Sequence, residues 1–225
     1  LVIAASPIEI GLALGDLRPP ETNRWRDWRR TLRAEYEISL GGGLGSGFVS
    51  AGLVPLDQVA AHLARRLPAG AIVCNGAGQY AATLQRQYVY RAYPSQLAPL
   101  SGSMGYGLPA AIAAKLAYPD RIIVAIAGDG CFQMTGAELA TAVQLELPLI
   151  IIIANNNKLG SIETAQLKSN PPRVIATTLV NPDFARLAQA TGAAGFCADN
   201  IGDFAAALEQ ALTSRGPAVI EIAVA

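Results

Sequence analysis

Two short polar motifs, each directly after a run of apolar residues, carry groups that bind metal ions and anions. They are Gly128-Asp129-Gly130 and Asn155-Asn156-Asn157. Carboxylate, amide and main-chain oxygens suit Mg²⁺ or Ca²⁺ rather than zinc, and Mg²⁺ usually shares its few protein ligands with phosphate oxygens. The glycines beside Asp129 let backbone amides approach an anion closely. If the two motifs meet in the fold, this pattern predicts a metal and phosphate site.

The spacing of the motifs favours a shared site. Either motif alone also fits an ordinary turn, because Gly, Asp and Asn are among the commonest turn residues. Asn156, however, follows Asp129 by 27 positions, and one predicted helix and one apolar strand lie between them. That is the chain length that joins neighbouring parallel strands through a helix.

The elements that must position these motifs form an α/β pattern after residue 50. The predicted strands are apolar throughout, which is typical of strands buried on both faces. They span residues 71–74, 121–127, 148–154 and 218–223. The predicted helices span 55–67, 136–146 and 204–212, one begins at Leu108-Pro109, and one runs from a cap at Asn181-Pro182 to Gly192. We therefore expect a doubly wound parallel sheet with helices on both faces, which binds ligands beyond the carboxyl ends of its strands.

Residues 1–50 lack this alternation, and residues 41–47 are glycine-rich, as in a linker. We expect residues 51–225 to form one domain and residues 1–50 to lie outside it. The sequence begins Leu-Val-Ile without a methionine. We therefore expect either an interior piece of a longer polypeptide or one chain of a split pair.

Charge and cysteine content exclude several classes of protein. The 17 basic and 17 acidic residues balance, so nothing predicts binding to nucleic acid or to a membrane surface. The three cysteines are widely spaced and odd in number, which argues against a disulfide framework and favours a cytoplasmic protein. The sole histidine, His62, lies in the predicted helix 55–67, well before any site loop, and we expect it to be an exposed or hydrogen-bonded helix residue.

A Gly-Asp-Gly followed after about thirty residues by Asn-Asn is the fingerprint of thiamine diphosphate (ThDP) enzymes. Residues 128–162 resemble the pyrophosphate-binding domain of ThDP-dependent 2-oxoacid decarboxylases and carboligases. The resemblance extends from about residue 52 to the C-terminus. It is close to the acetolactate-synthase-like branch through residues 136–142 and 179–184. Residues 1–37 resemble the tail of the middle domain of that family.

The resemblance implies a set of ligands for Mg²⁺ and the diphosphate. The metal ligands are the side chains of Asp129 and Asn156 and the main-chain carbonyl of Lys158. Gly130 and Cys131 offer backbone amides to the diphosphate, and we include Gly128 of the same loop among the cofactor-binding residues. No chemical role is implied for the thiol of Cys131.

Two further segments complete the predicted cofactor site. Met104 lies 25 positions before Asp129 and matches the apolar residue that bends the cofactor, while the carbonyl of Gly102 accepts a hydrogen bond from its pyrimidine amine. Gly78-Gln79-Tyr80 resembles the family's phosphate loop, and the resemblance implies that all three bind diphosphate oxygens. Tyr80 stands where the family more often has His. A second departure follows the Asn triplet, where Ala165-Gln166 replaces the family's His-Gln pair.

The resemblance implies decarboxylation of a pyruvate-like 2-oxoacid, with the product protonated or joined to a second carbonyl compound. The activating glutamate of the family lies on a pyrimidine-binding domain, usually of a neighbouring subunit. The residues before 51 are too few for that fold. We therefore expect no catalytic residue in this chain, a partner domain in cis or in trans, and a homo-oligomer of two or four subunits.

Two alternatives remain open. The chain is either part of such an enzyme or a non-catalytic module that holds ThDP or another diphosphate. A doubly wound nucleotide-binding domain is less favoured, because the glycine-rich residues 41–47 do not follow a convincing strand.

Overall fold

The computed structural model describes residues 4–18, 24–40 and 52–224. The chain divides into two compact units, residues 1–38 and residues 39–225. The predicted domain boundary at residue 50 and the predicted linker at residues 41–47 fall outside the described residues. The assignment of residues 1–50 to a preceding domain therefore stays a prediction.

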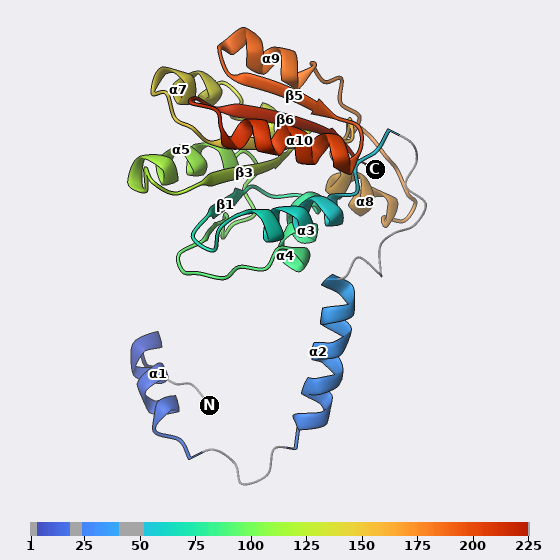
Figure 1. Cartoon of the computed structure of the whole chain (residues 1–225). Helices are drawn as coiled ribbons and strands as arrows, with labels where there is room; N and C mark the ends of the chain where they lie inside the picture. Colours follow the sequence, from blue (N-terminus) through green and yellow to red (C-terminus); the bar gives the residue numbers. More distant parts are fainter. Residues whose placement is uncertain (1–3, 19–23, 41–51, 225) are drawn as a thin grey trace. The chain divides into compact units, whose positions relative to one another are not determined.

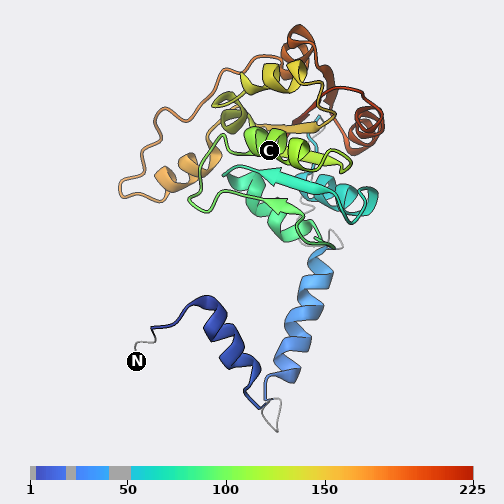
Figure 2. The same ribbon diagram turned by 90° about the vertical axis from the view of Figure 1, so that its left-hand side faces the viewer.

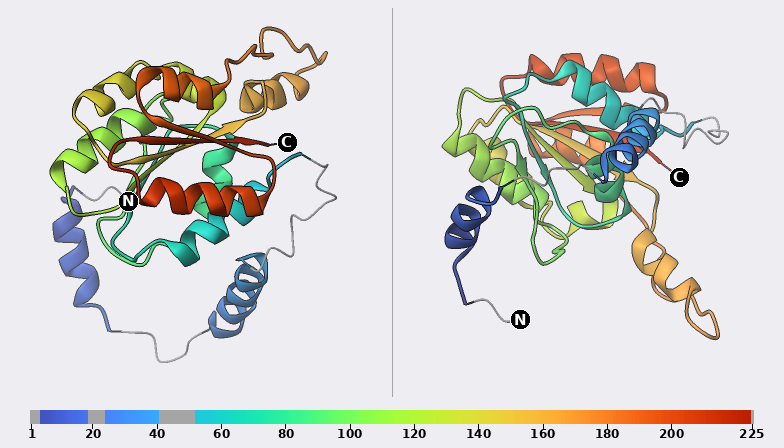
Figure 3. Two further views of the ribbon diagram at one scale, coloured as in Figure 1. Left: turned by 45° about the horizontal axis from the view of Figure 1, so that its top comes forward. Right: turned by 90° about the horizontal axis from the view of Figure 1, so that it is seen from below.

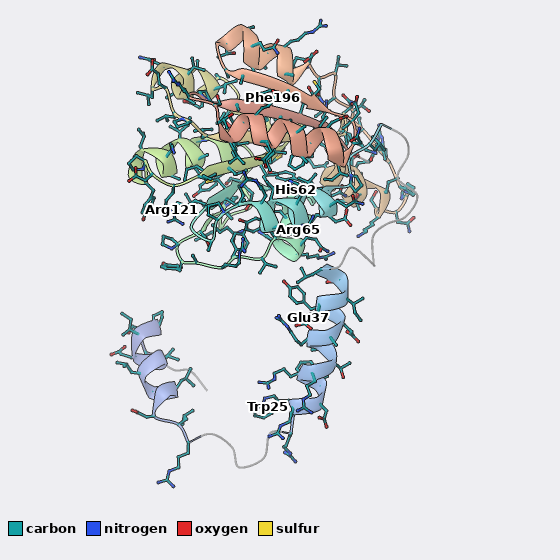
Figure 4. The ribbon with its side chains drawn as sticks, viewed as in Figure 1. Trp25, Glu37, His62, Arg65, Arg121 and Phe196 are labelled. Atoms are coloured by element: carbon teal, nitrogen blue, oxygen red, sulfur yellow. The ribbon has the colours of Figure 1, made fainter. Side chains whose placement is uncertain are left out.

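The described residues of the first unit form two helices, α1 (Pro7–Gly15) and α2 (Arg26–Leu40), of which α2 ends two residues beyond the unit. Ser6 begins α1 with a capping box, in which its hydroxyl accepts from the Glu9 amide and the Glu9 carboxylate accepts from the Ser6 amide. Figure 4 labels Trp25, which directly precedes α2, and Glu37, which lies in the last turn of the helix. Arg33 pairs with Glu37 one turn later at 2.7 Å, an exposed pair that stabilises the helix only slightly.

In the second unit, the described residues form one parallel sheet of six strands in the order β2-β1-β3-β4-β6-β5 (Figure 1). The strands are β1 (Ile72–Asn75), β2 (Gln96–Leu97), β3 (Ile123–Gly128), β4 (Ile150–Asn155), β5 (Ala194–Ala198) and β6 (Ala218–Ala223). β3 and β4 pair directly, with Gly128 opposite Ala154. The two polar motifs therefore begin at the same edge of the sheet.

Helices cover both faces of the sheet, as expected for a doubly wound fold (Figures 1 and 2). They are α3 (Leu56–Arg66), α4 (Gln79–Gln87), α5 (Gly107–Ala117), α6 (Asp129–Gln133), α7 (Glu138–Gln144), α8 (Gly160–Leu167), α9 (Phe184–Thr191) and α10 (Ile201–Leu212). Alternate strand residues point to opposite faces. Ile126 and Ile152 pack with α3, α4 and α10, whereas Ile151 and Ile153 pack with α5, α7 and α9.

His62 on α3 has a packing role in this core. Its ring lies edge-on to Phe204 of α10, with 5.8 Å between the ring centroids, and Figure 4 labels His62 on α3. Burial is the main reason that the pKa of His62 is lowered, and Arg65 adds to the effect. The expectation of an exposed or hydrogen-bonded histidine is wrong, because His62 is half-buried and its Nε2 has no hydrogen-bond partner among the described residues. His62 lies outside the cavity described below.

One predicted helix start is wrong. Asn181 does not cap α9; Asp183 does, and its carboxylate accepts from the Arg186 amide at 2.8 Å. The predicted end is right, because Gly192 closes the helix in the left-handed conformation. The side chain of Asn181 is thereby left to make other contacts. No helix in the described segments is long and apolar enough to span a membrane.

Candidate active site

The carboxyl ends of β1, β3 and β4 surround a cavity of about 230 Å³. The chain leaves β1 toward β2 on one side and returns to form β3 on the other. The cavity therefore lies at the topological switch point of the sheet, which is where doubly wound domains bind ligands. Figure 3 shows α8 and the loop after it standing out from the body of the domain beside this edge.

All eleven residues proposed from the sequence line this cavity. They are Gly78, Gln79, Tyr80, Gly102, Met104, Gly128, Asp129, Gly130, Cys131, Asn156 and Lys158. Seven further residues complete the wall, namely Ala77, Ala154, Leu159, Gly160, Ser161, Ile162 and Val224. The structure brings the predicted residues together, while their contacts to a cofactor remain predictions.

Asp129 is the charged group at the base of the cavity. The residue is 3% exposed, and its two carboxylate oxygens accept from the Gly130 amide at 2.8 Å and from Asn181 Nδ2 at 2.7 Å. Within the described part of the chain, no basic side chain forms an ion pair with it. A buried carboxylate without a cationic partner is costly. This donor set therefore fits a bound cation.

The turn after β4 supplies the other predicted metal ligands. The Lys158 amide donates to Asn156 Oδ1 at 3.3 Å, while the Lys158 ammonium pairs with Glu163 at 3.1 Å. Asn157 adopts a left-handed φ of 57°, a conformation that Asn tolerates better than most residues. Its carbonyl accepts from the Leu179 amide at 2.8 Å. The turn is thus held in shape by the segment that leads to α9.

Tyr80 and Cys131 meet at the wall of the cavity. The Tyr80 hydroxyl donates to Cys131 Sγ at 3.2 Å, and the Gly105 amide donates to the same sulfur at 3.1 Å. Burial raises the pKa of Tyr80, so its phenol is neutral at physiological pH. Tyr80 lines the cavity as predicted, but in this structure its hydroxyl is engaged by a protein sulfur.

Glycines bring backbone close to the cavity at two places. A methyl group on Gly130 would come within 2.6 Å of Leu159 Cδ2, and one on Gly128 would lie 3.1 Å from the Tyr80 ring. In the loop before α5, Gly102 and Gly105 have φ values of 68° and 81°, which glycine adopts at little cost. These residues keep the loop main chain, with half-buried Met104 between them, open toward the cavity.

Two side chains behind the cavity were not identified from the sequence. Asn181 donates to Asp129 and also to Asn155 Oδ1 at 2.8 Å. Glu221, within β6, accepts from Asn155 Nδ2 at 2.7 Å. The sequence predicts Asn181 to be a helix cap, and Glu221 lies in an apolar strand whose neighbours are known only once the strand order is known. The one signal in the sequence was the position of Glu221, a charged residue inside the otherwise apolar segment 218–223.

Comparison with known proteins agrees with this geometry. Residues 76–222 match the family model described as "Thiamine pyrophosphate enzyme, C-terminal TPP binding domain", in which thiamine pyrophosphate is another name for ThDP. The chain is also similar in structure to a Rhodococcus jostii thiamine diphosphate-dependent 4-hydroxybenzoylformate decarboxylase. The TM-score is 0.74 at 31% identity, over 79% of this chain and 34% of that one.

Similar sequences include acetolactate synthases. The chain is 36% identical to the acetolactate synthase isozyme 2 large subunit of Escherichia coli over 72% of its own length and 30% of that protein. It is 35% identical to the mitochondrial catalytic subunit of acetolactate synthase from Saccharomyces cerevisiae over 68% of its length and 22% of that protein. The chain thus spans less than a third of the length of these two relatives. It belongs to the thiamine diphosphate enzyme family, as an acetolactate-synthase-like C-terminal ThDP-binding domain.

Proposed function

We propose that this domain holds the diphosphate of ThDP through Mg²⁺ and serves an enzyme that decarboxylates a pyruvate-like 2-oxoacid. The observation that carries the proposal is the buried Asp129 carboxylate, which has no basic partner in the described residues and faces a glycine-lined cavity. Asp129, Asn156 and the Lys158 carbonyl would hold the metal. The backbone amides of Gly130 and Cys131 would bind the diphosphate, and the Gly130 amide would exchange its present contact with Asp129 for the diphosphate.

Bound ThDP supplies a carbon nucleophile for the 2-oxoacid carbonyl, which no amino-acid side chain provides. The role of this chain would be to bind and orient the cofactor. Gly102 would accept from the pyrimidine amine, and Met104 would set the shape of the cofactor. Leu159, Ile162 and Val224 would add apolar surface to the same cavity.

The residues that line the cavity include neither glutamate nor histidine among those described. We therefore propose that a pyrimidine-binding domain, from the same polypeptide or a partner subunit, contributes the activating glutamate. The cofactor would lie between the two domains, so the working unit would be at least a dimer. A second carbonyl compound as acceptor, as in the acetolactate synthases that this chain resembles, belongs to the same proposal.

The proposal is tested by mixing the chain with saturating ThDP, Mg²⁺ and pyruvate and following the release of CO₂. We expect no turnover by the chain alone and steady turnover once a pyrimidine-binding domain is added in cis or in trans. Turnover by the 225-residue chain alone would show that one of its own residues replaces the glutamate. The non-catalytic alternative predicts ThDP binding without turnover in both mixtures.

A further inference from the structure

One side chain joins the ends of the two strands that carry the proposed metal ligands. Asn181 Nδ2 lies 2.7 Å from Asp129 Oδ2, 2.8 Å from Asn155 Oδ1 and 3.2 Å from Asn157 Oδ1. Asp129 follows β3, Asn155 ends β4, and Asn181 comes from the separate segment that leads to α9. A single amide therefore connects three segments at the base of the cavity.

The orientation of this amide is fixed from both ends. The Glu221 carboxylate accepts from the Phe184 amide at 2.9 Å and from Asn155 Nδ2 at 2.7 Å. A carboxylate can only accept, so Asn155 must turn its NH₂ group toward Glu221 and its oxygen toward Asn181. Asn181 must therefore present its own NH₂ group to Asn155.

The same conclusion follows from the other end of the chain of hydrogen bonds. The Asp129 carboxylate also only accepts, and Gln133 Nε2 donates to Asn181 Oδ1 at 2.5 Å. The side-chain amides of Asn155 and Asn181 therefore each have one allowed orientation. Flipping Asn181 would set its oxygen against a carboxylate and its NH₂ group against another NH₂ group.

We infer that Asn181 is a positioning residue that holds the Asp129 carboxylate and the 155–157 turn in place for the metal. A neutral donor suits this role, because it orients the carboxylate without neutralising its charge, whereas Lys or Arg would compete with the cation. The inference rests on the proposed function. It extends that proposal beyond the residues that touch the metal to Asn181, Asn155 and Glu221.

Substitution of Asn181 is the direct test. Asn181→Leu keeps a similar volume and removes the donor. In metal sites, loss of an outer hydrogen-bond partner typically weakens affinity by roughly 10–100-fold. We expect a rise of that size in the apparent Kd for Mg²⁺, measured by calorimetric titration at fixed ThDP. The unfolding temperature measured in EDTA separates this effect from a general loss of stability.

Asn200 provides a matched control. Its Nδ2 donates to the Asp203 carboxylate at 2.6 Å and its oxygen accepts from two backbone amides, but it caps α10 and makes none of these hydrogen bonds with the residues at the ends of β3 and β4. Asn200→Leu should lower the unfolding temperature and leave the Kd for Mg²⁺ unchanged. If both variants weakened Mg²⁺ to the same extent, the positioning role of Asn181 would be refuted.

Glu221→Gln is a second test that leaves Asn181 in place. A glutamine can donate as well as accept, so it no longer fixes the orientation of the Asn155 amide. We expect a smaller rise in Kd than for Asn181→Leu, and effects that do not add in the double variant because both act through one chain of hydrogen bonds. Full additivity would contradict the inference.

The proposed function and the positioning role of Asn181 can be refuted separately. A wild-type protein that binds ThDP and Mg²⁺, beside an Asn181→Leu variant that binds Mg²⁺ equally well, overturns the positioning role alone. A wild-type protein that binds neither overturns the proposed function and the positioning role with it. A crystal structure of Asn181→Leu should show the Asp129 carboxylate turned from its present direction.

Discussion

Asp129 Oδ2 accepts a hydrogen bond from Asn181 Nδ2 at 2.7 Å, across 52 positions of sequence. The contact joins the Gly-Asp-Gly loop to a segment with no predicted part in the site. It exists because Asp183, not Asn181, caps α9. The proposed metal site is therefore built from strand ends and completed by a residue that precedes a helix.

Replacing Met104 should separate catalysis from binding. In Met104→Ala we expect kcat to fall by about tenfold or more, which corresponds to about 1.4 kcal/mol of transition-state stabilisation, while ThDP affinity changes much less. Met104→Leu nearly conserves volume and should be tolerated. Steady-state kinetics and ThDP titration of the assembled enzyme measure both quantities. A lower affinity with unchanged kcat would refute the proposal that Met104 bends the cofactor.

Tyr80→Phe distinguishes two roles for the phenol. The hydroxyl donates to Cys131 in the structure, so its loss should lower the free energy of unfolding by about 0.5–1.5 kcal/mol. If the hydroxyl serves only this contact, ThDP affinity should change by less than about tenfold, a difference of about 1.4 kcal/mol. A larger loss of affinity would show that the hydroxyl binds diphosphate, as the family resemblance implies.

Gly130→Ala tests the closeness of the loop backbone to the cavity. The added methyl group would lie 2.6 Å from Leu159 Cδ2, so the side chain or the loop must move. We expect weaker ThDP binding with the fold retained, and partial recovery in the double variant with Leu159→Ala. Gly216→Ala is the control, because nothing lies within 4 Å of a methyl group there. Equal ThDP affinities for the two single variants would contradict this account of the loop.

The sequence was sufficient for the four inner strands of the sheet and for most of the wall of the cavity. Four apolar segments predicted β1, β3, β4 and β6, and the 27-residue spacing predicted that two motifs meet at one edge, which the pairing of β3 with β4 confirms. The loops at this edge could be predicted because local backbone geometry favours Gly, Asp and Asn there. Such a local preference is visible in a single sequence.

The parts that sequence reasoning missed depend on tertiary contacts. β5 is an edge strand with mostly half-exposed residues, and β2 has only two, so neither shows an apolar run. α8 has no buried residue and therefore no clear amphipathic pattern. Asn181 lies next to Pro182, a pairing that is also typical of a helix start, and its contact with Asp129 follows only from the packing of α9.

The most direct test of the central claim is calorimetric titration of ThDP into the protein assembled with its pyrimidine-binding domain. We predict saturable binding in Mg²⁺, loss of that binding in EDTA, and the same loss in Asp129→Ala with Mg²⁺ present. Asp129→Ala should also unfold no earlier than the wild type in EDTA, because it removes a buried carboxylate without a cationic partner. ThDP affinity that is unchanged by EDTA or by Asp129→Ala would contradict the assignment of this cavity as a metal-dependent cofactor site.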